Sequence, residues 1–147
     1  MHLQDAIVAV VRRNGQFLVI RRAPDVIMPD YWAPLSGRVE PGESHEAAVA
    51  RETYEEVGLR VQPIEKVWEC PTDDRAFHLH WWIADAVEGA LRLNADEVSD
   101  ARWIRPEEFE ELKPTFAQDA EFFREVLPGL SVASKVFVGP TWKGTRR

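Results

Sequence analysis

The feature that most constrains the fold of this 147-residue chain is a helix predicted over residues 45–57, with strand-like segments before and after it. Ser44 suits the N-cap, because its hydroxyl can accept a backbone N–H of the first turn. Gly58 suits the position after the last turn, where glycine adopts a left-handed conformation. The apolar residues of the helix fall on one side, namely Ala47, Ala50, Tyr54 and Val57, with Thr53 at its edge.

Three glutamates, Glu52, Glu55 and Glu56, become neighbours on the opposite side of this helix. The three carboxylates repel one another, and they lie near the helix C-terminus, where the helix dipole disfavours anions. Arg51 offsets only part of the repulsion. A divalent cation would remove both penalties, because Mg²⁺ binds clustered carboxylates. Taken alone, three such glutamates more often form a solvated acidic face, although this helix lacks the interleaved lysines of such a face.

The remaining elements suggest an α+β chain. They are a β-hairpin over residues 5–22 around Asn14-Gly15, a short strand over 32–39, strands over 61–69 and 76–87, a short strand over 101–104, a helix from Pro106 to about 112 and an amphipathic helix over 115–126. This order predicts an α+β fold or an α/β/α sandwich with a mixed sheet. We expect one domain over residues 1–128, with residues 129–147 as a tail that is either part of it or mobile.

Composition limits the partners of the chain. A net charge of −7 and a pI near 5.1 argue against a nucleic-acid polymer as the main partner. A small phosphorylated substrate remains compatible when a cation lies between it and the carboxylates. The sequence has no apolar stretch of membrane-spanning length and no leader pattern, so no membrane partner and a cytoplasmic location are expected. The single cysteine, Cys70, excludes an internal disulfide.

The segment from Gly37 to Leu59 has a specific pattern of spacings. Gly37 precedes Glu43 by six positions, Glu43 precedes Arg51-Glu52 by eight, and Glu55-Glu56 and Gly58-Leu59 follow. This segment resembles the Nudix box at every fixed position, with Thr53 where the family usually has a larger apolar residue. Residues 17–23 also resemble the strand before the box in MutT-like members. The resemblance implies the Nudix fold, an α/β/α sandwich that carries a loop–helix–loop.

The resemblance also implies roles for individual residues. The metal ligands would be the Ser36 carbonyl, Glu52, Glu55 and Glu56, holding Mg²⁺ or alternatively Mn²⁺. Arg51 would orient the glutamates, Glu43 would tie down the loop, and Gly37 would allow an unusual backbone conformation and close approach. Glu52 is the first candidate for the general base and Glu97 its competitor, although Glu97 equally fits a solvated loop acid.

The substrate contacts are less constrained. Arg22 matches an arginine that contacts substrate phosphate in MutT-like members, although a surface strand arginine fits the sequence equally well. Trp32 is the candidate for stacking on a planar group, together with Trp68, Phe77, Trp81 and Trp82, most of which should be core residues. His78 and His80 alternate on one strand, but the sequence shows no third metal ligand near them, which favours a structural role.

The function that these residues imply is Mg²⁺-dependent hydrolysis of a diphosphate linkage in a nucleoside-diphosphate-linked substrate. Candidate substrates are a nucleoside triphosphate, a nucleotide sugar or a dinucleotide. The alternatives are a non-catalytic, nucleotide-sensing Nudix module and an isoprenyl-diphosphate isomerase of the same fold. The family resemblance also leaves room for a homodimer.

Overall fold

The N-terminal hairpin is formed as the sequence predicts. In the computed structural model, which describes residues 3–130, β1 (Gln4–Arg13) and β2 (Gln16–Arg22) pair antiparallel. Asn14 and Gly15 connect them with φ angles of 53° and 78°. Two consecutive positive φ angles are what a tight two-residue hairpin turn requires, and Asn-Gly adopts them readily.

Seven strands form one mixed sheet, in which β3, β2, β1, β6 and β5 follow one another, β4 pairs with β1 and β7 pairs with β2. The other strands are β3 (Trp32–Ala33), β4 (Leu35–Arg38), β5 (Arg60–Pro71), β6 (Phe77–Glu88) and β7 (Val98–Ile104). Strands β1 and β6 are parallel, whereas β4 runs antiparallel to β1. The mixed sheet that the sequence predicts is therefore confirmed.

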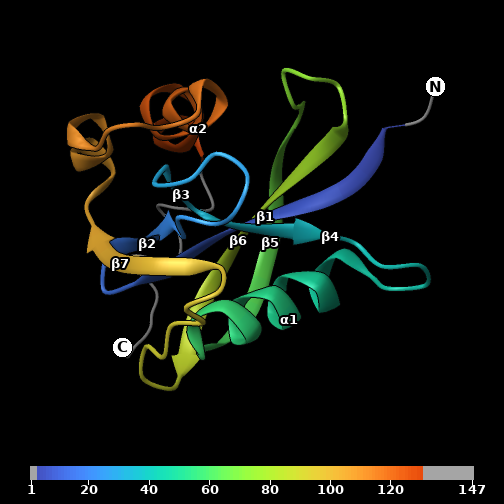
Figure 1. Cartoon of the computed structure of the whole chain (residues 1–147), viewed down its shortest axis with the longest axis horizontal. Helices are drawn as coiled ribbons and strands as arrows, with labels where there is room; N and C mark the ends of the chain where they lie inside the picture. The colour runs from blue at the N-terminus through green and yellow to red at the C-terminus, as the bar shows by residue number, and fades with distance from the viewer. Residues whose placement is uncertain (1–2, 131–147) are drawn as a thin grey trace.

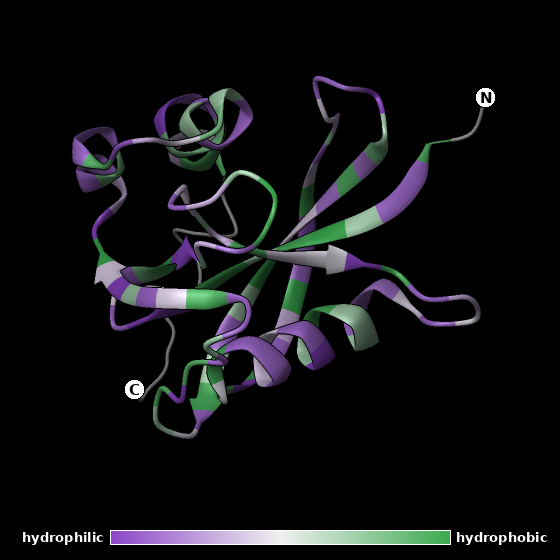
Figure 2. Cartoon of the chain, viewed as in Figure 1, coloured by the Kyte–Doolittle hydropathy of each residue, from purple (hydrophilic) through white to green (hydrophobic). Residues whose placement is uncertain are grey.

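Helices cover both faces of this sheet (Figure 1). Helix α1 (His45–Val57) packs on one face, against Ile7, Ala9 and Val11 of β1. On the other face, alternate residues of β1 pack with Phe122 and Phe123 of the C-terminal helical segment. Figure 2 shows apolar bands in the strands and mostly hydrophilic residues along α1. The strand period of two thus gives each helical layer its own apolar core.

The C-terminal helical segment differs from the predicted helix over residues 115–126. It begins at Ala117 and consists of α2 (Ala117–Glu121), a π-helical turn η2 (Phe122–Val126) and a short 3₁₀ turn η3 (Leu127–Gly129). The segment before it, η1 (Pro106–Glu111), is 3₁₀ rather than α-helical. Phe122 and Phe123 begin the π-helical turn, which is wider than an α turn. Although they are consecutive, both side chains are buried.

The side of α1 that packs on the sheet is not the side on which the sequence collects its apolar residues. Ala47 and Tyr54 are exposed. The residues of α1 that have no exposed surface are Ala48, Val49, Thr53 and Val57. Thr53 is accommodated because its hydroxyl donates to the Val49 carbonyl at 2.8 Å. This orientation turns Glu56 towards the protein interior instead of solvent.

The tail after Leu130 lies outside the described residues, so the predicted division at residue 128 remains a prediction. Among residues 3–130, no helix has both the length and the apolar character that crossing a membrane requires.

Candidate active site

Two of the three predicted glutamates of α1 face inwards. Glu56 is 8% exposed and the Glu52 side chain 15%, whereas the Glu55 side chain is 56% exposed. Glu52 and Glu56 are one helical turn apart, and their carboxyl groups are hydrogen-bonded to each other. The helix therefore presents one buried carboxyl group, that of Glu56, paired with the partly buried carboxyl group of Glu52, and a third at its solvent edge.

The environment of Glu56 favours its protonated form. Burial, then the hydrogen bond and charge of Glu52 and the charge of Glu97, raise the pKa of Glu56 to about 9, although the Arg22 charge acts in the opposite direction. Glu56 is therefore neutral at pH 7 in the absence of a cation. A divalent cation with oxygen preference can replace that proton and neutralise both carboxylates. The donor set thus fits Mg²⁺ or Mn²⁺.

Gly37 allows strand β4 to approach this pair. A Cβ atom at Gly37 would overlap the carboxylate of Glu52. Gly37 is not among the glycines with positive φ, so the unusual backbone conformation expected for it is wrong. What requires glycine here is the close approach of Glu52 to the strand.

Arg51 connects the glutamates to the loop before the helix. Its Nε donates to Glu43 Oε2 at 2.8 Å, and its Nη1 donates to Glu52 Oε2 at 3.0 Å and Glu55 Oε1 at 3.3 Å. The Glu43 hydrogen bond is the main cause of the raised pKa of Arg51, which therefore stays charged. Glu43 also accepts the Glu40 backbone N–H at 3.0 Å, so one network joins loop and helix.

Other predicted residues lie around the pair. Ser36, on β4, lines the adjacent cavity, as does Arg22 from the end of β2. The guanidinium of Arg22 donates to the Ile27 carbonyl at 2.6 and 2.9 Å, which fixes it against the loop after β2. Glu97 is exposed, and its carbonyl accepts the Ala23 N–H at 3.0 Å. Gly58 ends α1 with a φ of 77°, the left-handed conformation expected there.

Trp32 lies apart from these residues. It is 6% exposed, and the guanidinium carbon of Arg102 lies 4.5 Å from its ring centroid. It does not line the cavity. Of the five aromatic residues considered for stacking, only Phe77 does so, and Trp81 is fully buried in the core. These aromatics lie on three strands, and only the position of each strand in the sheet decides which side chain reaches the cavity.

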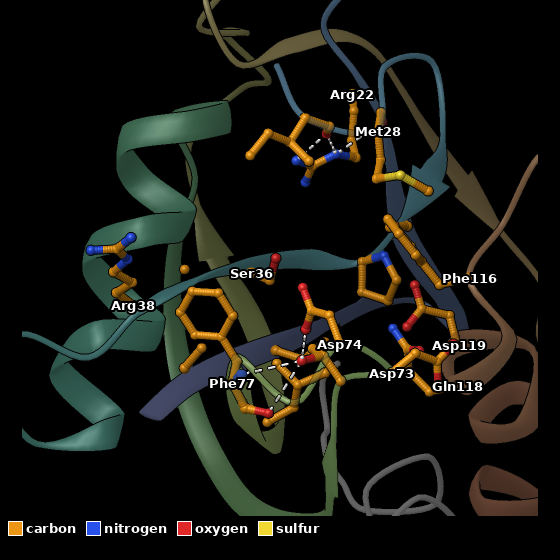
Figure 3. Close-up of a pocket in the computed structure, with 18 residues that line it drawn as sticks. Arg22, Met28, Ser36, Arg38, Asp73, Asp74, Phe77, Phe116, Gln118 and Asp119 are labelled. Atoms are coloured by element: carbon orange, nitrogen blue, oxygen red, sulfur yellow. Dashed lines mark hydrogen bonds between the residues drawn. The ribbon is translucent and has the colours of Figure 1, made fainter. Parts of the chain in front are cut away.

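A cavity of about 470 Å³ opens on the other side of Gly37 from Glu52, and Figure 3 shows the residues that line it. Its wall includes Ser36 and Gly37 of β4, so the cavity begins where Glu52 approaches the strand. In Figure 3, Phe116, Gln118 and Asp119 lie on one side of the cavity and Arg38 and Phe77 on the other. The volume is within the range of small-ligand sites.

Asp119 is a cavity residue that the sequence reasoning missed. It is 4% exposed, and burial raises its pKa to about 8, although the Gln118 hydrogen bond and the Arg22 charge act in the opposite direction. A buried acid with a raised pKa in a cavity is a candidate for ligand binding. The signal was present, because Asp119 precedes the buried Phe122 and Phe123 by three and four positions and so shares their helix face.

The buried Glu56 predicts how the stability of the metal-free protein depends on pH. Its pKa is raised from 4.5 to about 9, so the stability contributed by its neutral form is complete below pH 4.5 and is lost as the pH rises to about 9. We expect the Tm in EDTA to fall over this window more steeply for the native protein than for Glu56→Gln, which cannot ionise. Saturating Mg²⁺ should raise the native Tm most at the alkaline end. Scanning calorimetry at several pH values checks this, and parallel pH curves for the two proteins would contradict it.

The chain is similar in sequence to known proteins over most of its length. Residues 1–126 match the sequence model of the NUDIX domain. The NAD-capped RNA hydrolase NudC of Mannheimia succiniciproducens is 30% identical over 125 residues, which are 83% of this chain and 46% of that protein. The CTP pyrophosphohydrolase of Escherichia coli is 31% identical over 110 residues, which are 74% of this chain and 80% of that protein. The chain therefore spans less than half of the NudC relative and most of the CTP pyrophosphohydrolase.

A solved structure shares the fold. The MutT NUDIX hydrolase of Burkholderia pseudomallei superimposes with a TM-score of 0.75 at 21% identity, covering 86% of this chain and 99% of that chain. The NUDIX match covers the sheet, α1 and nearly all of the helical segment that closes the cavity. The chain belongs to the Nudix hydrolase family.

Proposed function

We propose that this protein is a divalent-cation-dependent pyrophosphohydrolase that cleaves the diphosphate linkage of a nucleoside-diphosphate-linked substrate. The observation that carries the proposal is the meeting of two features at Gly37, which lines the cavity and lies against the Glu52 carboxylate. A ligand in the cavity would thus extend its phosphates towards Glu52 and Glu56.

The residues that would hold the cation are Glu52, Glu55, Glu56 and the Ser36 carbonyl. A bound Mg²⁺ or Mn²⁺ supplies charge neutralisation of phosphate oxygens and a lower pKa for coordinated water. Because Arg51 and Gly37 fix Glu52 from two sides, its carboxylate is our first candidate to accept the proton of the attacking water. Water then adds to phosphorus as the bridging P–O bond breaks, and Glu97 is the alternative base.

Arg22 is proposed to bind a phosphate oxygen. Its hydrogen bonds to the Ile27 and Met28 carbonyls hold the guanidinium at the cavity wall. A guanidinium fixed before the substrate arrives loses less side-chain entropy on binding. The same group lies close enough to lower the pKa of both Glu56 and Asp119, which supports a position between the cation site and the far end of the cavity.

Asp119 is proposed to recognise the base of the nucleotide. With its pKa raised to about 8, the carboxyl group is mostly protonated at pH 7 and offers one donor and one acceptor. That pair complements a base edge with a ring-nitrogen acceptor beside an amino donor, as in cytosine and adenine. Phe77 and Phe116 line the same cavity and supply aromatic surface for the ring.

The test of the proposed function is a product-resolved screen of diphosphate compounds with Mg²⁺, with Mn²⁺ and with EDTA. We expect hydrolysis of at least one nucleoside triphosphate, nucleotide sugar or dinucleotide that stops in EDTA. Nucleotide binding without hydrolysis of any compound would favour a non-catalytic module. Conversion of isopentenyl diphosphate to its allylic isomer would favour an isomerase.

Replacing Asp119 tests recognition of the base. We expect Asp119→Ala to raise KM for the best nucleotide by about 10-fold or more. The buried base edge would lose its hydrogen-bond partner, which costs about 1–3 kcal/mol of binding free energy. The kcat and the hydrolysis of a diphosphate that carries no base should change little. Asp96→Asn, which changes an exposed acid in the loop before β7, is the matched control. An equal loss for substrates with and without a base would contradict the assignment.

An NAD-capped RNA is a second candidate substrate, favoured by the NudC relative. The net charge of −7 gives little support to binding of the RNA chain itself. Hydrolysis of free NAD and of an NAD-capped oligonucleotide, each measured at two salt concentrations, separates a small-nucleotide substrate from a capped RNA. Contacts with the RNA backbone would make hydrolysis of the capped oligonucleotide salt-dependent.

A further inference from the structure

Two histidines on β6 lie apart from the cavity. Phe77 and Leu79 of this strand line the cavity, so the alternate residues His78 and His80 project from the opposite sheet face, which α1 covers. The His45 ring, at the start of α1, lies 4.2 Å from the His80 ring, which confirms the direction. The neighbouring strand β5 brings Glu69 opposite His80 in the antiparallel register.

Glu69 is the third ligand that the sequence could not identify. Among residues 3–130, Glu69, His78 and His80 each offer one ligand atom, and these atoms lie within 4.8 Å of one another. Zn²⁺ holds nitrogen and oxygen ligands at about 2.0–2.1 Å, which separates tetrahedral neighbours by about 3.3 Å. Glu69 Oε1 and His78 Nε2 form a hydrogen bond at 2.5 Å, so a cation would take the place of this contact and separate the two atoms by a small side-chain rotation. Lys66 Nζ donates to the other Glu69 oxygen, Oε2, at 2.5 Å, so Glu69 would bind through Oε1 alone.

His80 is arranged as a metal-binding histidine is. Its Nε2 lies 2.9 Å from Asp5 Oδ1, which fixes the proton on that nitrogen. The residue is only 8% exposed, and its Nδ1 is buried. Within the described part of the chain, this nitrogen has no hydrogen-bond partner. A ligating histidine commonly donates its second ring N–H to a carboxylate, and this orients the ring and increases its basicity. A cation bound through Nδ1 would give this nitrogen a partner, while Nε2 keeps its contact with Asp5.

We propose that Glu69, His78 and His80 form a transition-metal site of the zinc type, with Asp5 as the supporting carboxylate. Two imidazoles and one carboxylate suit Zn²⁺, whereas Mg²⁺ prefers oxygen ligands throughout. The site is accessible, because the His78 side chain is 34% exposed and that of Glu69 48%. It links β5 to β6 directly and β1 through Asp5, so the metal stabilises this end of the sheet independently of hydrolysis.

Imidazole ¹⁵N NMR of the native protein tests the site without any substitution. The protein is stripped of metal and titrated with Zn²⁺ in excess Mg²⁺, which occupies the carboxylate site on α1. We expect the ring nitrogens of His78 and His80 to shift or broaden before one equivalent is added, and Mg²⁺ alone to leave them unchanged. Unchanged resonances of both rings after one equivalent of Zn²⁺ would overturn the proposal.

Variants measure the contribution of each ligand to Zn²⁺ affinity, determined by competition with a chromophoric chelator. The Glu56→Gln background minimises binding at the other site. We expect His78→Gln and His80→Gln each to weaken the affinity by about 100-fold or more and Asp5→Asn by about 10- to 100-fold. Glu65→Gln, an exposed acid on the same strand as Glu69, should have no effect. Circular dichroism confirms folding, and equal Zn²⁺ affinity of folded His78→Gln and the background protein would contradict the site.

Discussion

Glu56→Gln is expected to lower kcat for diphosphate hydrolysis by about 10³-fold, which corresponds to roughly 4 kcal/mol of activation free energy. The substitution keeps the shape of the side chain and removes the charge that the cation site needs. Glu56 is buried, and its pKa is raised to about 9, so the metal-free protein already holds a neutral group at this position. The variant should therefore fold normally, and the loss should come from metal binding and chemistry.

Steady-state kinetics over a range of Mg²⁺ concentrations, together with thermal unfolding in EDTA, check this prediction. Glu46→Gln is the matched control, because it removes an exposed acid from the first turn of the same helix and should leave kcat unchanged. Hydrolysis by Glu56→Gln at the native rate would remove Glu56 from the reaction. If Glu56→Gln instead has a much lower Tm than the native protein at pH 7 in EDTA, then the fold does not accommodate a neutral side chain at this position.

Gly37→Ala is expected to lower kcat/KM by about 10²-fold, the size of effect that follows when a catalytic group is displaced by about 1 Å. The new Cβ would overlap the Glu52 carboxylate, so that either Glu52 or strand β4 must move. Overpacking of this kind also destabilises the fold by about 1–3 kcal/mol. Backbone strain is not the cause, because Gly37 is outside the positive-φ glycines.

A double-mutant cycle isolates the contact between Gly37 and Glu52. If the overlap causes the destabilisation, Gly37→Ala should lower the free energy of unfolding much less in a Glu52→Ala background than in the native protein. Gly129→Ala is the control for adding a methyl group to glycine, since a Cβ there meets nothing within 4 Å. Equal destabilisation by Gly37→Ala in both backgrounds would show that the strand itself, and not Glu52, rejects the side chain.

The sequence predicted the parts of the site that depend on local spacing. Ser44 and Gly58 defined the ends of α1, and the glutamates were expected on one surface because residues three and four apart on a helix are neighbours. It did not predict the rotation of α1 about its axis. Helical spacing puts Tyr54 with the apolar side, but Tyr54 is exposed, while Thr53 and Glu56 are buried. Helical periodicity specifies which residues share a face, but only packing decides which face turns inwards.

Groups from distant parts of the chain could not be combined from the sequence. Asp119 is separated from Ser36 by more than half of the chain, yet both line one cavity. Glu69 is close to His78 and His80 in the sequence, but it faces them only because β5 and β6 pair in a particular register. Register depends on the packing of both sheet faces and on strand irregularities, which no single segment encodes.

By itself, the sequence determined the family, the mixed α+β architecture and the helix that carries the three glutamates, because hydrophobic period, capping and fixed motif spacing are local properties. Only the tertiary structure decided which glutamate is buried, why position 37 is glycine and which buried acid lines the cavity. These depend on the distance between side chains from separate elements, and that distance is set by how the helices pack on the two faces of the sheet.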